Sequence, residues 1–435
     1  MTALLNDFII KAINNKKIIN VIGDCLLDES YEVEKRYNPE SAAPAFNITK
    51  KLQSLPGGAG NVIYQYQNMP LKSRLYGAID NHSKQVYQDH DIKTNNTVKC
   101  DNTPRKIRYY QDNKILQRID NEIIKDHNFT GRLKHSDINV FSDYDKGFLV
   151  KPWFKDFLHN AIIDPKPTGS IYKWHGCHAI KLNCREAYSI TNSRHSHSQL
   201  DIISKLTGCK NIVITRSGNG VTGLDDGEYF YIEQPGVIVK SVVGAGDCFL
   251  AYFSYAKALG FSTKESCNIA IVASTIYVSK ETRTPLNLID LVIDKIVPCA
   301  SLLKNRDFNL VFTNGCFDVL HAGHIECLKF AKSKGDKLVV ALNSDDSIKR
   351  LKGVERPINN MQNRASVMAA LAMVDYIVDF DENTPFDIIN KIKPDSIVKG
   401  SSYSKDEIVG HDLVKEVFIC PMVESLSSTN ILNKI

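Results

Sequence analysis

Short apolar runs that end in glycine or polar residues recur along the chain, and helix-like segments separate them. Lys17 to Asp24 reads KIINVIGD, Ile212 to Gly220 reads IVITRSGNG, and Leu338 to Asn343 reads LVVALN. Apolar runs of this length bounded by turn residues predict buried strands, and strands that alternate with helices predict a mainly parallel sheet. The pattern therefore predicts an α/β fold with ligands at the carboxyl ends of the strands.

Residues Arg105 to Asp120 depart from this alternation. Their sequence, RKIRYYQDNKILQRID, gives two strand-like pieces around Asp112, which is typical of a β-hairpin. Such a hairpin would form a small β lid over a ligand, with Arg108 and Arg118 available to a sugar phosphate. For each arginine the alternative is an ordinary exposed position on a sheet.

Length and composition predict more than one globular domain. The 435 residues exceed the usual size of a single core, and the helical-looking stretch 290–306 leaves hardly any linker, so we place the domains at 1–302 and 303–435.

The net charge of +5 is small and no dense run of lysine or arginine occurs, so we expect no nucleic-acid partner. The amino terminus lacks the features of a secretion signal and no apolar run could span a bilayer, so we expect no membrane association.

Eleven cysteines are scattered along the chain without a C-x-x-C pair. An odd number argues against a disulfide framework, so we expect reduced thiols and a cytoplasmic protein. His175, Cys177, His178 and Cys184 raise the question of zinc, but their spacing matches no familiar zinc site. We therefore expect no metal that is held by a protein cluster alone.

The stretch from Val311 to His324, VFTNGCFDVLHAGH, combines a strand end, a glycine turn and a helix start. Backbone N–H groups and the positive end of a helix dipole can hold an anion at such a junction. His321 and His324 flank Gly323, so both imidazoles can meet one phosphate. The stretch therefore predicts a phosphate-handling site.

A metal site is the alternative for two histidines at this spacing. The further ligands would have to come from Cys316, Asp318, Glu326 and Cys327, whose spacings match no known site. The complete string TNGCFDVLHAGH is more specific than H-x-G-H and resembles the signature of the cytidylyltransferase-like nucleotidylyltransferases. The resemblance implies that both histidines stabilise charge on the α-phosphate while a phosphate nucleophile displaces pyrophosphate, without a covalent enzyme intermediate. It also implies nucleotide contacts for Thr313, Asn314, Gly315 and Phe317.

Two glycine-rich stretches lie in the first half of the chain. Pro56 to Asn61 reads PGGAGN, in which the glycines allow close backbone approach and Asn61 offers an amide to sugar hydroxyls. Val243 to Phe249 reads VGAGDCF and leads into an apolar helix, so its successive N–H groups can cradle an anion. Asp247 can accept the proton of a hydroxyl that attacks the γ-phosphate. Each stretch alone could also be an ordinary loop or a turn capped by aspartate.

Together with G-D near the start, N-x-x-E and T-R-S-G-x-G, these stretches follow the order seen in the ribokinase-like sugar kinases, which the chain resembles over about residues 17 to 297. The resemblance implies that Asp247 is the catalytic base beside an anion hole and that Mg²⁺ arrives with ATP. It implies sugar contacts for Asp24, Gly57, Gly58, Asn61, Arg108 and Lys166. It implies nucleotide contacts for Asn183, Glu186, Thr215, Gly218, Gly244, Ala245 and Gly246. For Asp24 the alternative is a helix or turn cap.

Two departures from these families bear on activity. The kinases commonly have D-T-x-G-A-G-D, whereas this chain has Ser241, Val242 and Val243 before the glycine, so we expect slower kinase chemistry rather than none. The transferases of this kind often have Gly-Gly-Asp-Tyr after a V-K-G lysine, whereas this chain reads GSSY from Gly400 to Tyr403. Loss of that acid bears on the choice of substrate.

Basic and hydroxyl residues extend the transferase resemblance over nearly all of residues 308 to 435. Lys352 and Arg356 can meet a triphosphate or a sugar phosphate as a point charge and a planar fork. For Arg364 a phosphate contact and a solvated helix face are both open. The final S-S-T-N-I predicts a helix cap whose N–H and hydroxyl groups could also bind phosphate. Its hydroxyl residues are Ser427, Ser428 and Thr429.

A ribokinase-like domain ahead of such a transferase resembles the bifunctional family of heptose-7-phosphate kinases and heptose-1-phosphate adenylyltransferases. The resemblance implies a ribokinase-like α/β domain with a small β lid, followed by a Rossmann-like domain. It implies that the first half phosphorylates O1 of D-glycero-D-manno-heptose 7-phosphate with ATP. The second half would join heptose 1-phosphate to AMP from ATP and release pyrophosphate, on the route to ADP-heptose. We also consider a homodimer through the kinase domain.

Two other functions stay open. The same H-x-G-H chemistry serves transferases that use CTP with an alcohol phosphate such as glycerol phosphate. The first half could also be a weak or inactive kinase module beside an active transferase. The first alternative is tested by which nucleotide yields pyrophosphate with heptose 1-phosphate. The second is tested by whether the chain shows kinase turnover.

Overall fold

The computed structural model describes residues 1–40, 45–112, 114–122, 127, 129–166, 170–280, 282–292, 295–304, 306–400 and 404–421. The chain folds into two compact units, one of Met1 with Lys11–Leu286 and one of Thr2–Ile10 with Asn287–Ile435. Helix α1 (Thr2–Asn14) is divided between them. The domain boundary between residues 302 and 303 stays a prediction.

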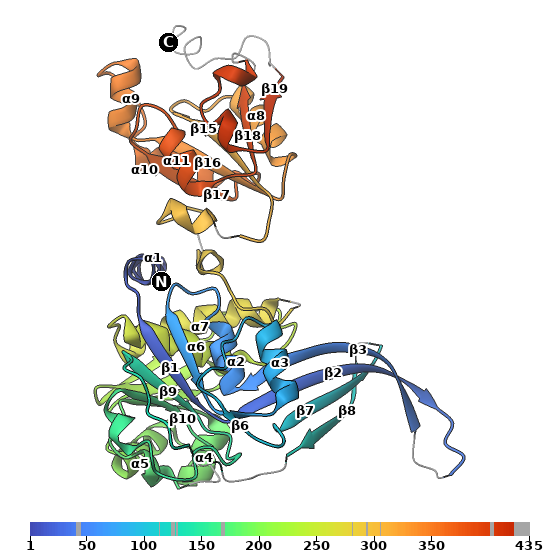
Figure 1. Cartoon of the computed structure of the whole chain (residues 1–435). Helices are drawn as coiled ribbons and strands as arrows, with labels where there is room; N and C mark the ends of the chain where they lie inside the picture. Colours follow the sequence, from blue (N-terminus) through green and yellow to red (C-terminus); the bar gives the residue numbers. More distant parts are fainter. Residues whose placement is uncertain are drawn as a thin grey trace. The chain divides into compact units, whose positions relative to one another are not determined.

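The first unit is built on an eight-stranded sheet, and all its described pairings are parallel except the two that β13 makes (Figure 1). The predicted α/β fold with a mainly parallel sheet is therefore confirmed. From one edge to the other the strands are β14 (Glu228–Ile232), β13 (Val221–Asp225), β12 (Ile212–Thr215), β11 (Ala179–Asn183), β10 (Ala161–Asp164), β9 (Ile138–Ser142), β1 (Ile18–Gly23) and β4 (Lys72–Tyr76).

Helices cover both faces of this sheet because alternate side chains of each strand point to opposite sides. Strand β11 sends Ile180 and Leu182 into a core that also holds Leu200 of α5. Lys181 lies between them and projects to the other face, where its Nζ would lie 3.5 Å from a Cβ at Gly246 of α6. The helices of the unit are α2 (Ala59–Gln65), α3 (Asn81–Asp89), α4 (Cys184–Thr191), α5 (Ser196–Thr207), α6 (Ala245–Ala258) and α7 (Thr263–Ser279).

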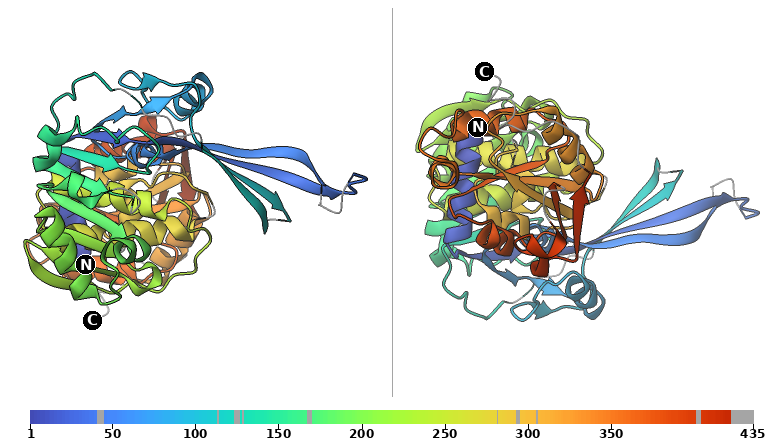
Figure 2. Two further views of the ribbon diagram at one scale, coloured as in Figure 1. Left: turned by 90° about the horizontal axis from the view of Figure 1, so that it is seen from below. Right: turned by 90° about the horizontal axis from the view of Figure 1, so that it is seen from above.

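A separate four-stranded sheet projects from the rest of the first unit as a lid (Figure 2). The predicted hairpin over 105–120 is confirmed, since two of its strands pair antiparallel there. The strands, in sheet order, are β3 (Ala45–Gly58), β2 (Cys25–Arg36), β7 (Arg105–Gln111) and β8 (Lys114–Asn121). A minor parallel pair joins β5 (Ala78–Ile79) and β6 (Val98–Lys99).

The second unit contains a five-stranded parallel sheet with its first strand in the middle, which is a Rossmann-like strand order. The strands, in sheet order, are β17 (Tyr376–Phe380), β16 (Lys337–Asn343), β15 (Leu310–Gly315), β18 (Ser396–Gly400) and β19 (Glu416–Cys420). The helices are α8 (Ala322–Lys332), α9 (Asp345–Lys352), α10 (Met361–Ala369) and α11 (Phe386–Ile392).

The stretch 290–306 is not a single helix, so that prediction was wrong. Short 3₁₀ turns cover Leu288–Leu291 and Ala300–Lys304. Between them Ile296 forms a parallel β-bridge with Ile377. The physical reason lies in Pro298, which has no backbone N–H to continue a helix and biases the residue before it towards extended backbone.

All eleven cysteines fall within the described residues and are free thiols. In the described ranges, no group of three or more histidine, cysteine or acidic side chains could hold a metal ion. None of the helices that the structure describes is both long and apolar enough to cross a membrane.

Candidate functional site

A cavity of about 260 Å³ opens at the carboxyl edge of the eight-stranded sheet, where β9, β10 and β11 end and α6 begins. It brings Asp247 together with several residues predicted to meet ATP or sugar. Its lining consists of Asp143, Tyr144, Asp164, Pro165, Lys166, Lys181, Asn183, Glu186, Gly244, Gly246 and Asp247. After the activity that the sequence predicts for this unit, we call it the kinase cavity.

Asp247 lies buried in the first turn of α6 and is held by two hydrogen bonds. Asn61 donates its Nδ2 to Oδ2 at 2.5 Å, and Tyr144 donates its hydroxyl to Oδ1 at 3.2 Å. Burial raises the pKa of Asp247 to about 6, although the Asn61 amide and the charge of Lys181 act against it. The carboxylate is therefore ionised at pH 7 and more basic than an exposed aspartate, as a general base should be.

Gly244 is required by the backbone that precedes Asp247. Its φ is +84°, and a Cβ there would lie 2.8 Å from the hydroxyl of Tyr277 and 3.0 Å from Nδ2 of Asn61. Since a side chain would collide with the group that holds Asp247, only glycine fits. Ala245 follows as the first residue of α6, so the N–H groups of 244–246 lie at a helix start, where an anion is stabilised.

Two lysines that the sequence did not single out, Lys181 and Lys106, add positive charge near the cavity. Lys181 donates Nζ to both carboxylate oxygens of Asp164 at 3.1 Å. Lys106 of the lid and the predicted Lys166 lie over the ring of Tyr144, with Nζ 4.7 Å and 5.6 Å from its centroid. Lys181 could have been identified from the sequence, because a lysine inside the otherwise apolar strand IKLN is unusual. Lys106 could not, because the residue pattern of β7 does not distinguish it from its neighbours.

Asp24 holds a loop rather than lining the kinase cavity. Its Oδ2 accepts the backbone N–H groups of Tyr144 at 2.9 Å and Lys146 at 3.0 Å, and its Oδ1 accepts that of Phe148 at 3.0 Å. Burial raises its pKa to about 6, against these hydrogen bonds. The geometry agrees with the turn-capping alternative, and Asp24 thereby fixes the segment that carries Tyr144. A sugar contact for Asp24 stays a prediction.

The other predicted sugar residues lie at the base of the lid. Gly57 and Gly58 end β3, and a Cβ at Gly58 would collide with the Leu26 side chain. Arg108 is buried and donates to Asp28 Oδ1 at 2.9 Å. Arg118 forms an exposed pair with the Asp120 carboxylate, as expected of the surface alternative.

The N-x-x-E motif forms a capping box at the start of α4. The Asn183 side chain accepts the backbone N–H of Glu186 at 3.0 Å, and Glu186 Oε2 accepts that of Asn183 at 2.8 Å. Burial, followed by the charge of Asp164, raises the pKa of Glu186. Both side chains still line the kinase cavity, whereas Thr215 and Gly218 do not. Thr215 ends β12 and donates to the carbonyl of Leu182 at 3.2 Å.

In the second unit, His321 and His324 come together at the start of α8. His321 is the residue that precedes the helix, and its ring stacks on that of His324 with the centroids 3.8 Å apart. Nδ1 of each ring is buried without a hydrogen-bond partner in the described residues. Buried polar atoms are almost always paired in native proteins, so these two nitrogens are available to a ligand or to water.

Both histidines are neutral at pH 7. Burial lowers the pKa of His321. Burial, the neighbouring His321 and the charge of Lys352 lower the pKa of His324 to about 4. Phe317 packs against His324 with the ring centroids 5.0 Å apart. A polyphosphate would supply negative charge next to the rings and raise both pKa values towards the usual range of histidine.

The residues that end β15 shape the same site. Thr313 is buried, and Oδ1 of Asn314 is a further buried atom with no partner in the described residues. A Cβ at Gly315 would lie 3.0 Å from the ring of Phe317. Lys399 of β18 donates Nζ to the Asn314 carbonyl at 3.2 Å, and burial lowers its pKa to about 8.

The three basic residues predicted near this site have different environments. Arg356 pairs with Asp318 at 3.1 Å, while its NH1 is buried without a partner among the described residues. Lys352 is exposed at the end of α9. Arg364 is 2% exposed, which excludes the solvated helix face. It donates to the carbonyls of Cys316, Asn343 and Asn359 and to the Asp345 carboxylate, at 2.7 to 3.0 Å.

Arg364 is therefore a buried strut that ties three loops of the site together. The remaining predicted contacts, Ser427, Ser428 and Thr429, lie outside the described residues, as do Ser401 to Tyr403.

Known proteins match both units. Residues 155–287 match the model of the pfkB family carbohydrate kinases, and residues 312–434 match the cytidylyltransferase-like model. The bifunctional protein HldE of a Nitratiruptor species is 31% identical over an alignment of 462 positions, which covers 96% of this chain and 99% of that protein. HldE of a Helicobacter pylori strain is 32% identical and covers 97% of this chain and 98% of its own.

Solved structures match the first unit. The ribokinase of Thermotoga maritima has a TM-score of 0.52 at 18% identity and covers 66% of this chain and 100% of its own. An Arabidopsis thaliana ribokinase solved with ribose and ATP has a TM-score of 0.51 at 16% identity, covering 64% and 98%. These likenesses confirm the predicted ribokinase-like fold. Together with the relatives that match from end to end, they show that this chain belongs to the bifunctional HldE family, enzymes with a sugar kinase followed by a nucleotidylyltransferase.

Proposed function

We propose that this chain catalyses two steps of ADP-heptose biosynthesis. The first unit transfers the γ-phosphoryl group of ATP to O1 of D-glycero-D-manno-heptose 7-phosphate. After a separate phosphatase has removed the 7-phosphate, the second unit transfers AMP from ATP to heptose 1-phosphate and releases pyrophosphate. One observation carries the proposal: a chain that matches HldE proteins along its whole length keeps a phosphate-handling site in each unit.

In the kinase cavity, Asp247 is the base that accepts the proton of the attacking O1 hydroxyl. Asn61 and Tyr144 each hold one carboxylate oxygen, which fixes the direction of the remaining lone pairs. The N–H groups of residues 244–246 stabilise the transferred phosphoryl group. Lys106 and Lys166, which lie over Tyr144, supply positive charge to the phosphorylated sugar.

Mg²⁺ is proposed to arrive with ATP. Mg²⁺ is usually held by one or two carboxylates together with substrate phosphates, and Glu186 offers such a carboxylate at the cavity wall. One Glu186 oxygen accepts the Asn183 N–H, and the other has no hydrogen bond with a described residue. The Asp164 oxygens are bonded to Lys181. When bound, the ion neutralises charge that develops between the β- and γ-phosphates.

In the second unit, His321 and His324 bind the phosphates of ATP and stabilise the charge that develops on the α-phosphate. The nucleophile is the phosphate of heptose 1-phosphate, which is already ionised and needs no general base. Neutral imidazoles with unpaired Nδ1 atoms suit that role, because each ring can donate one hydrogen bond to a phosphate oxygen. Lys352 and Arg356 supply the adjacent positive charge.

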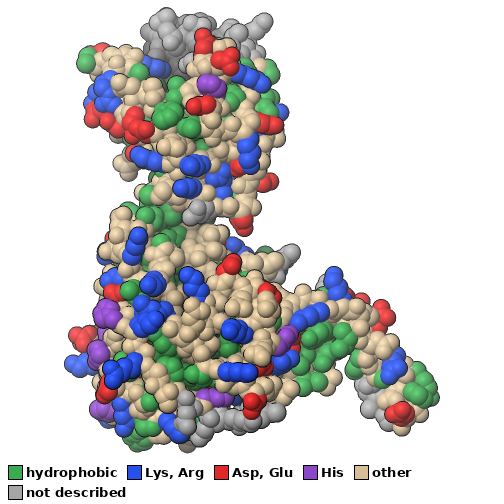
Figure 3. All heavy atoms as spheres, in the orientation of Figure 1, with side chains coloured by type: hydrophobic (Ala, Val, Ile, Leu, Met, Phe, Trp, Pro, Cys, Tyr) green, Lys and Arg blue, Asp and Glu red, His purple; other side chains and the backbone are tan. Residues whose placement is uncertain are grey.

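A homodimer through the lid is proposed for the kinase unit. Figure 3 shows hydrophobic side chains gathered on the lid. They include Ile48, Leu52, Ile115, Leu116 and Ile119, each at least 41% exposed. Apolar side chains clustered on one projecting sheet are typical of an interface. Sedimentation of the purified chain measures the dimer directly, and a monomer at all concentrations would exclude it.

The decisive experiment measures both reactions with one preparation. We expect ADP formation from ATP with heptose 7-phosphate, and pyrophosphate release from ATP with heptose 1-phosphate. Equal or faster pyrophosphate release from CTP with glycerol phosphate would reject the adenylyltransferase assignment. No kinase turnover in the wild-type chain would mean that the first unit is an inactive module.

A further inference from the structure

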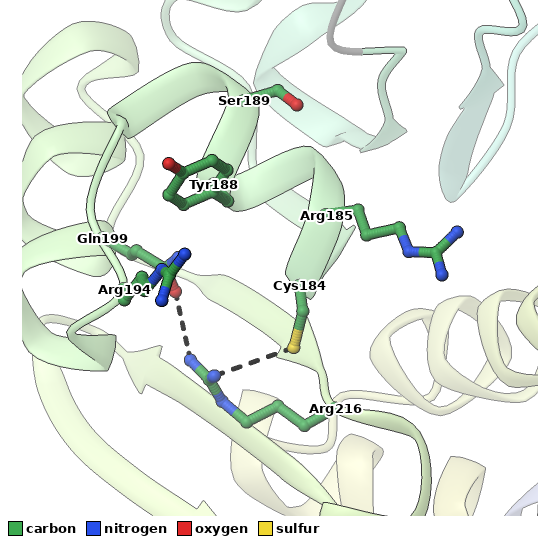
Figure 4. A pocket seen from close by; sticks show the side chains of 7 residues that line it. All are labelled: Cys184, Arg185, Tyr188, Ser189, Arg194, Gln199 and Arg216. Carbon is green, nitrogen blue, oxygen red and sulfur yellow. Dashed lines mark hydrogen bonds between the residues drawn. The ribbon is translucent and has the colours of Figure 1, made fainter.

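A second cavity of the first unit, of about 480 Å³, lies beside α4 and α5 and the turn after β12 (Figure 4). It shares no lining residue with the kinase cavity, and the reaction proposed above uses none of its side chains. Its lining consists of Cys184, Arg185, Tyr188, Ser189, Arg194, Gln199 and Arg216. We call it the arginine pocket.

The lining carries three positive charges and no carboxylate. Arg216 is held in place by uncharged acceptors. It donates Nε to Thr222 Oγ1 at 2.8 Å, NH2 to Gln199 Oε1 at 3.1 Å and NH1 to Cys184 Sγ at 3.7 Å. Its geometry is therefore fixed while its charge stays uncompensated.

Three other poorly exposed arginines have a carboxylate partner, whereas Arg74 and Arg283 bond only uncharged acceptors among the described residues. Arg108 pairs with Asp28 at 2.9 Å, Arg306 with Asp395 at 2.7 Å and Arg364 with Asp345 at 2.7 Å. A carboxylate next to a partly buried guanidinium offsets the cost of removing it from water. Arg216 has no ion pair among the described residues, so its counter-charge must come from solvent or from a ligand.

Arg194 adds a second charge on the same side. Its Cζ lies 5.9 Å from the centroid of the Tyr188 ring. Figure 4 shows the guanidinium groups of Arg194 and Arg216 extending into the same part of the pocket, whereas Arg185 extends away from them. Like charges that approach each other repel, and an anion between them removes that repulsion.

We propose that the arginine pocket binds an organic phosphate. The phosphoryl group lies against Arg194 and Arg216, because planar guanidinium forks pair with phosphate oxygens through two parallel hydrogen bonds. The rest of the ligand packs on the ring of Tyr188, which is 41% exposed. The volume exceeds the need of inorganic phosphate and lies within the range of small-molecule sites. A nucleotide and a sugar phosphate share this chemistry.

The first turn of α4 connects the two cavities. Cys184 and Arg185 of the arginine pocket directly follow Asn183, and Glu186 comes next, so the residues on either side of them line the kinase cavity. A ligand in the arginine pocket is therefore expected to change the KM of the kinase for ATP. This last consequence rests on the proposed kinase function, whereas binding itself does not.

Binding is tested on the full chain by alkylation of Cys184, which lines the pocket and is partly exposed. Iodoacetamide labelling is followed by peptide mass spectrometry, with the partly exposed Cys299 of the second unit as the internal reference. The probes are ADP, ribose 5-phosphate and inorganic phosphate. The test variant is Arg194→Ala, since this side chain is exposed and its loss should not disturb folding. Lys205→Ala, an exposed cation on α5, is the matched control.

We expect ADP or ribose 5-phosphate to slow Cys184 labelling at least about tenfold in wild type and in Lys205→Ala, and to lose this effect in Arg194→Ala. The probe that protects then identifies the ligand as nucleotide or sugar phosphate. Protection that persists in Arg194→Ala would place the ligand in the kinase cavity and overturn the proposal. Protection by inorganic phosphate alone, or by no probe, would also overturn it. The readout involves no turnover, so its failure leaves the kinase assignment intact.

Discussion

In the proposed function, phosphate is handled both by the kinase cavity and by the site of His321 and His324 in the second unit, which we call the histidine site. The two sites prepare their reactive groups in opposite ways. In the kinase cavity a buried carboxylate, Asp247, is held by two donors and its pKa is raised to about 6. In the histidine site burial lowers the pKa of both rings and leaves their Nδ1 atoms without partners among the described residues. One site offers a base, and the other offers neutral donors.

This difference follows from the two nucleophiles. A sugar hydroxyl must lose a proton when it attacks ATP, so the kinase cavity needs a base that is ionised near pH 7. A sugar phosphate has already lost its proton, so the second site needs only groups that stabilise charge at the α-phosphate. The two reactions should therefore respond differently to changes in titratable groups.

The largest expected effect comes from Asp247→Asn. Removal of the base should lower kinase kcat by about 10³-fold, while the transferase rate stays unchanged. Coupled ADP and pyrophosphate assays on the same preparation measure both rates. Asp156→Asn, an exposed aspartate of the first unit, is the control and should leave both activities intact. Kinase activity that survives the change at Asp247 would remove the base from this account.

A smaller effect, on the transferase instead of the kinase, is expected from His324→Ala. Loss of one imidazole should lower transferase kcat by about 10²-fold and leave kinase kcat unchanged, because the ring stabilises charge without moving a proton. Pyrophosphate release with ATP and heptose 1-phosphate measures the change. The exposed His411 serves as the matched alanine control. An unaffected transferase rate would mean that the stacked rings are structural.

Arg364→Met tests whether the histidine site depends on a buried strut. The change removes hydrogen bonds to three carbonyls and to Asp345, and it leaves those acceptors unpaired, so we expect about 2 to 4 kcal/mol less stability for the second unit. Chemical unfolding followed by circular dichroism measures the loss. Lys349→Met, on an exposed side chain of α9, should change stability by less than about 0.5 kcal/mol. Equal stabilities would show that Arg364 has no such role.

The smallest effect concerns the pH dependence of the kinase. The charge of Lys106 lowers the pKa of Asp247, so Lys106→Met should raise that pKa. Because the ionised carboxylate is the active form, the acidic limb of kcat/KM should move to higher pH. The ratio of activity at pH 6 to activity at pH 8 should be about threefold lower in the variant than in wild type. Lys114→Met on the exposed strand β8 should leave the limb in place. A shift to lower pH would contradict the electrostatic account.

Much of the fold could be predicted from the sequence because its signals are local. Apolar runs that end in glycine or polar residues predicted strands of the mainly parallel sheet and of the parallel sheet, and β-leaning pieces around Asp112 predicted the hairpin of the lid. The helix predicted over 290–306 failed because apolar spacing alone did not weigh Pro298 against it. A short apolar stretch can be helix or strand until its partner, here Ile377, is known.

The sites could be predicted only where a motif brings its residues together within a few positions. The capping box of Asn183 and Glu186 and the pair His321 and His324 are of this kind. Lys106 and Tyr144 reach Asp247 from distant segments, and no spacing along the chain announces such a meeting. For Arg364 the sequence left a phosphate contact and a solvated helix face open, because a charged side chain in a helix is usually exposed and its buried acceptors belong to other loops.

The central claim is that both sites act on one sugar. Its most direct test supplies the wild-type chain with ATP, heptose 7-phosphate and a phosphatase that removes the 7-phosphate, and follows the products by ³¹P NMR and mass spectrometry. We expect heptose 1,7-bisphosphate before the phosphatase is added and ADP-heptose with pyrophosphate after it. A mixture of the Asp247→Asn and His324→Ala chains should restore a rate of product formation that neither chain reaches alone. Absence of the bisphosphate, or a CMP adduct formed in preference when CTP is present, would contradict the account.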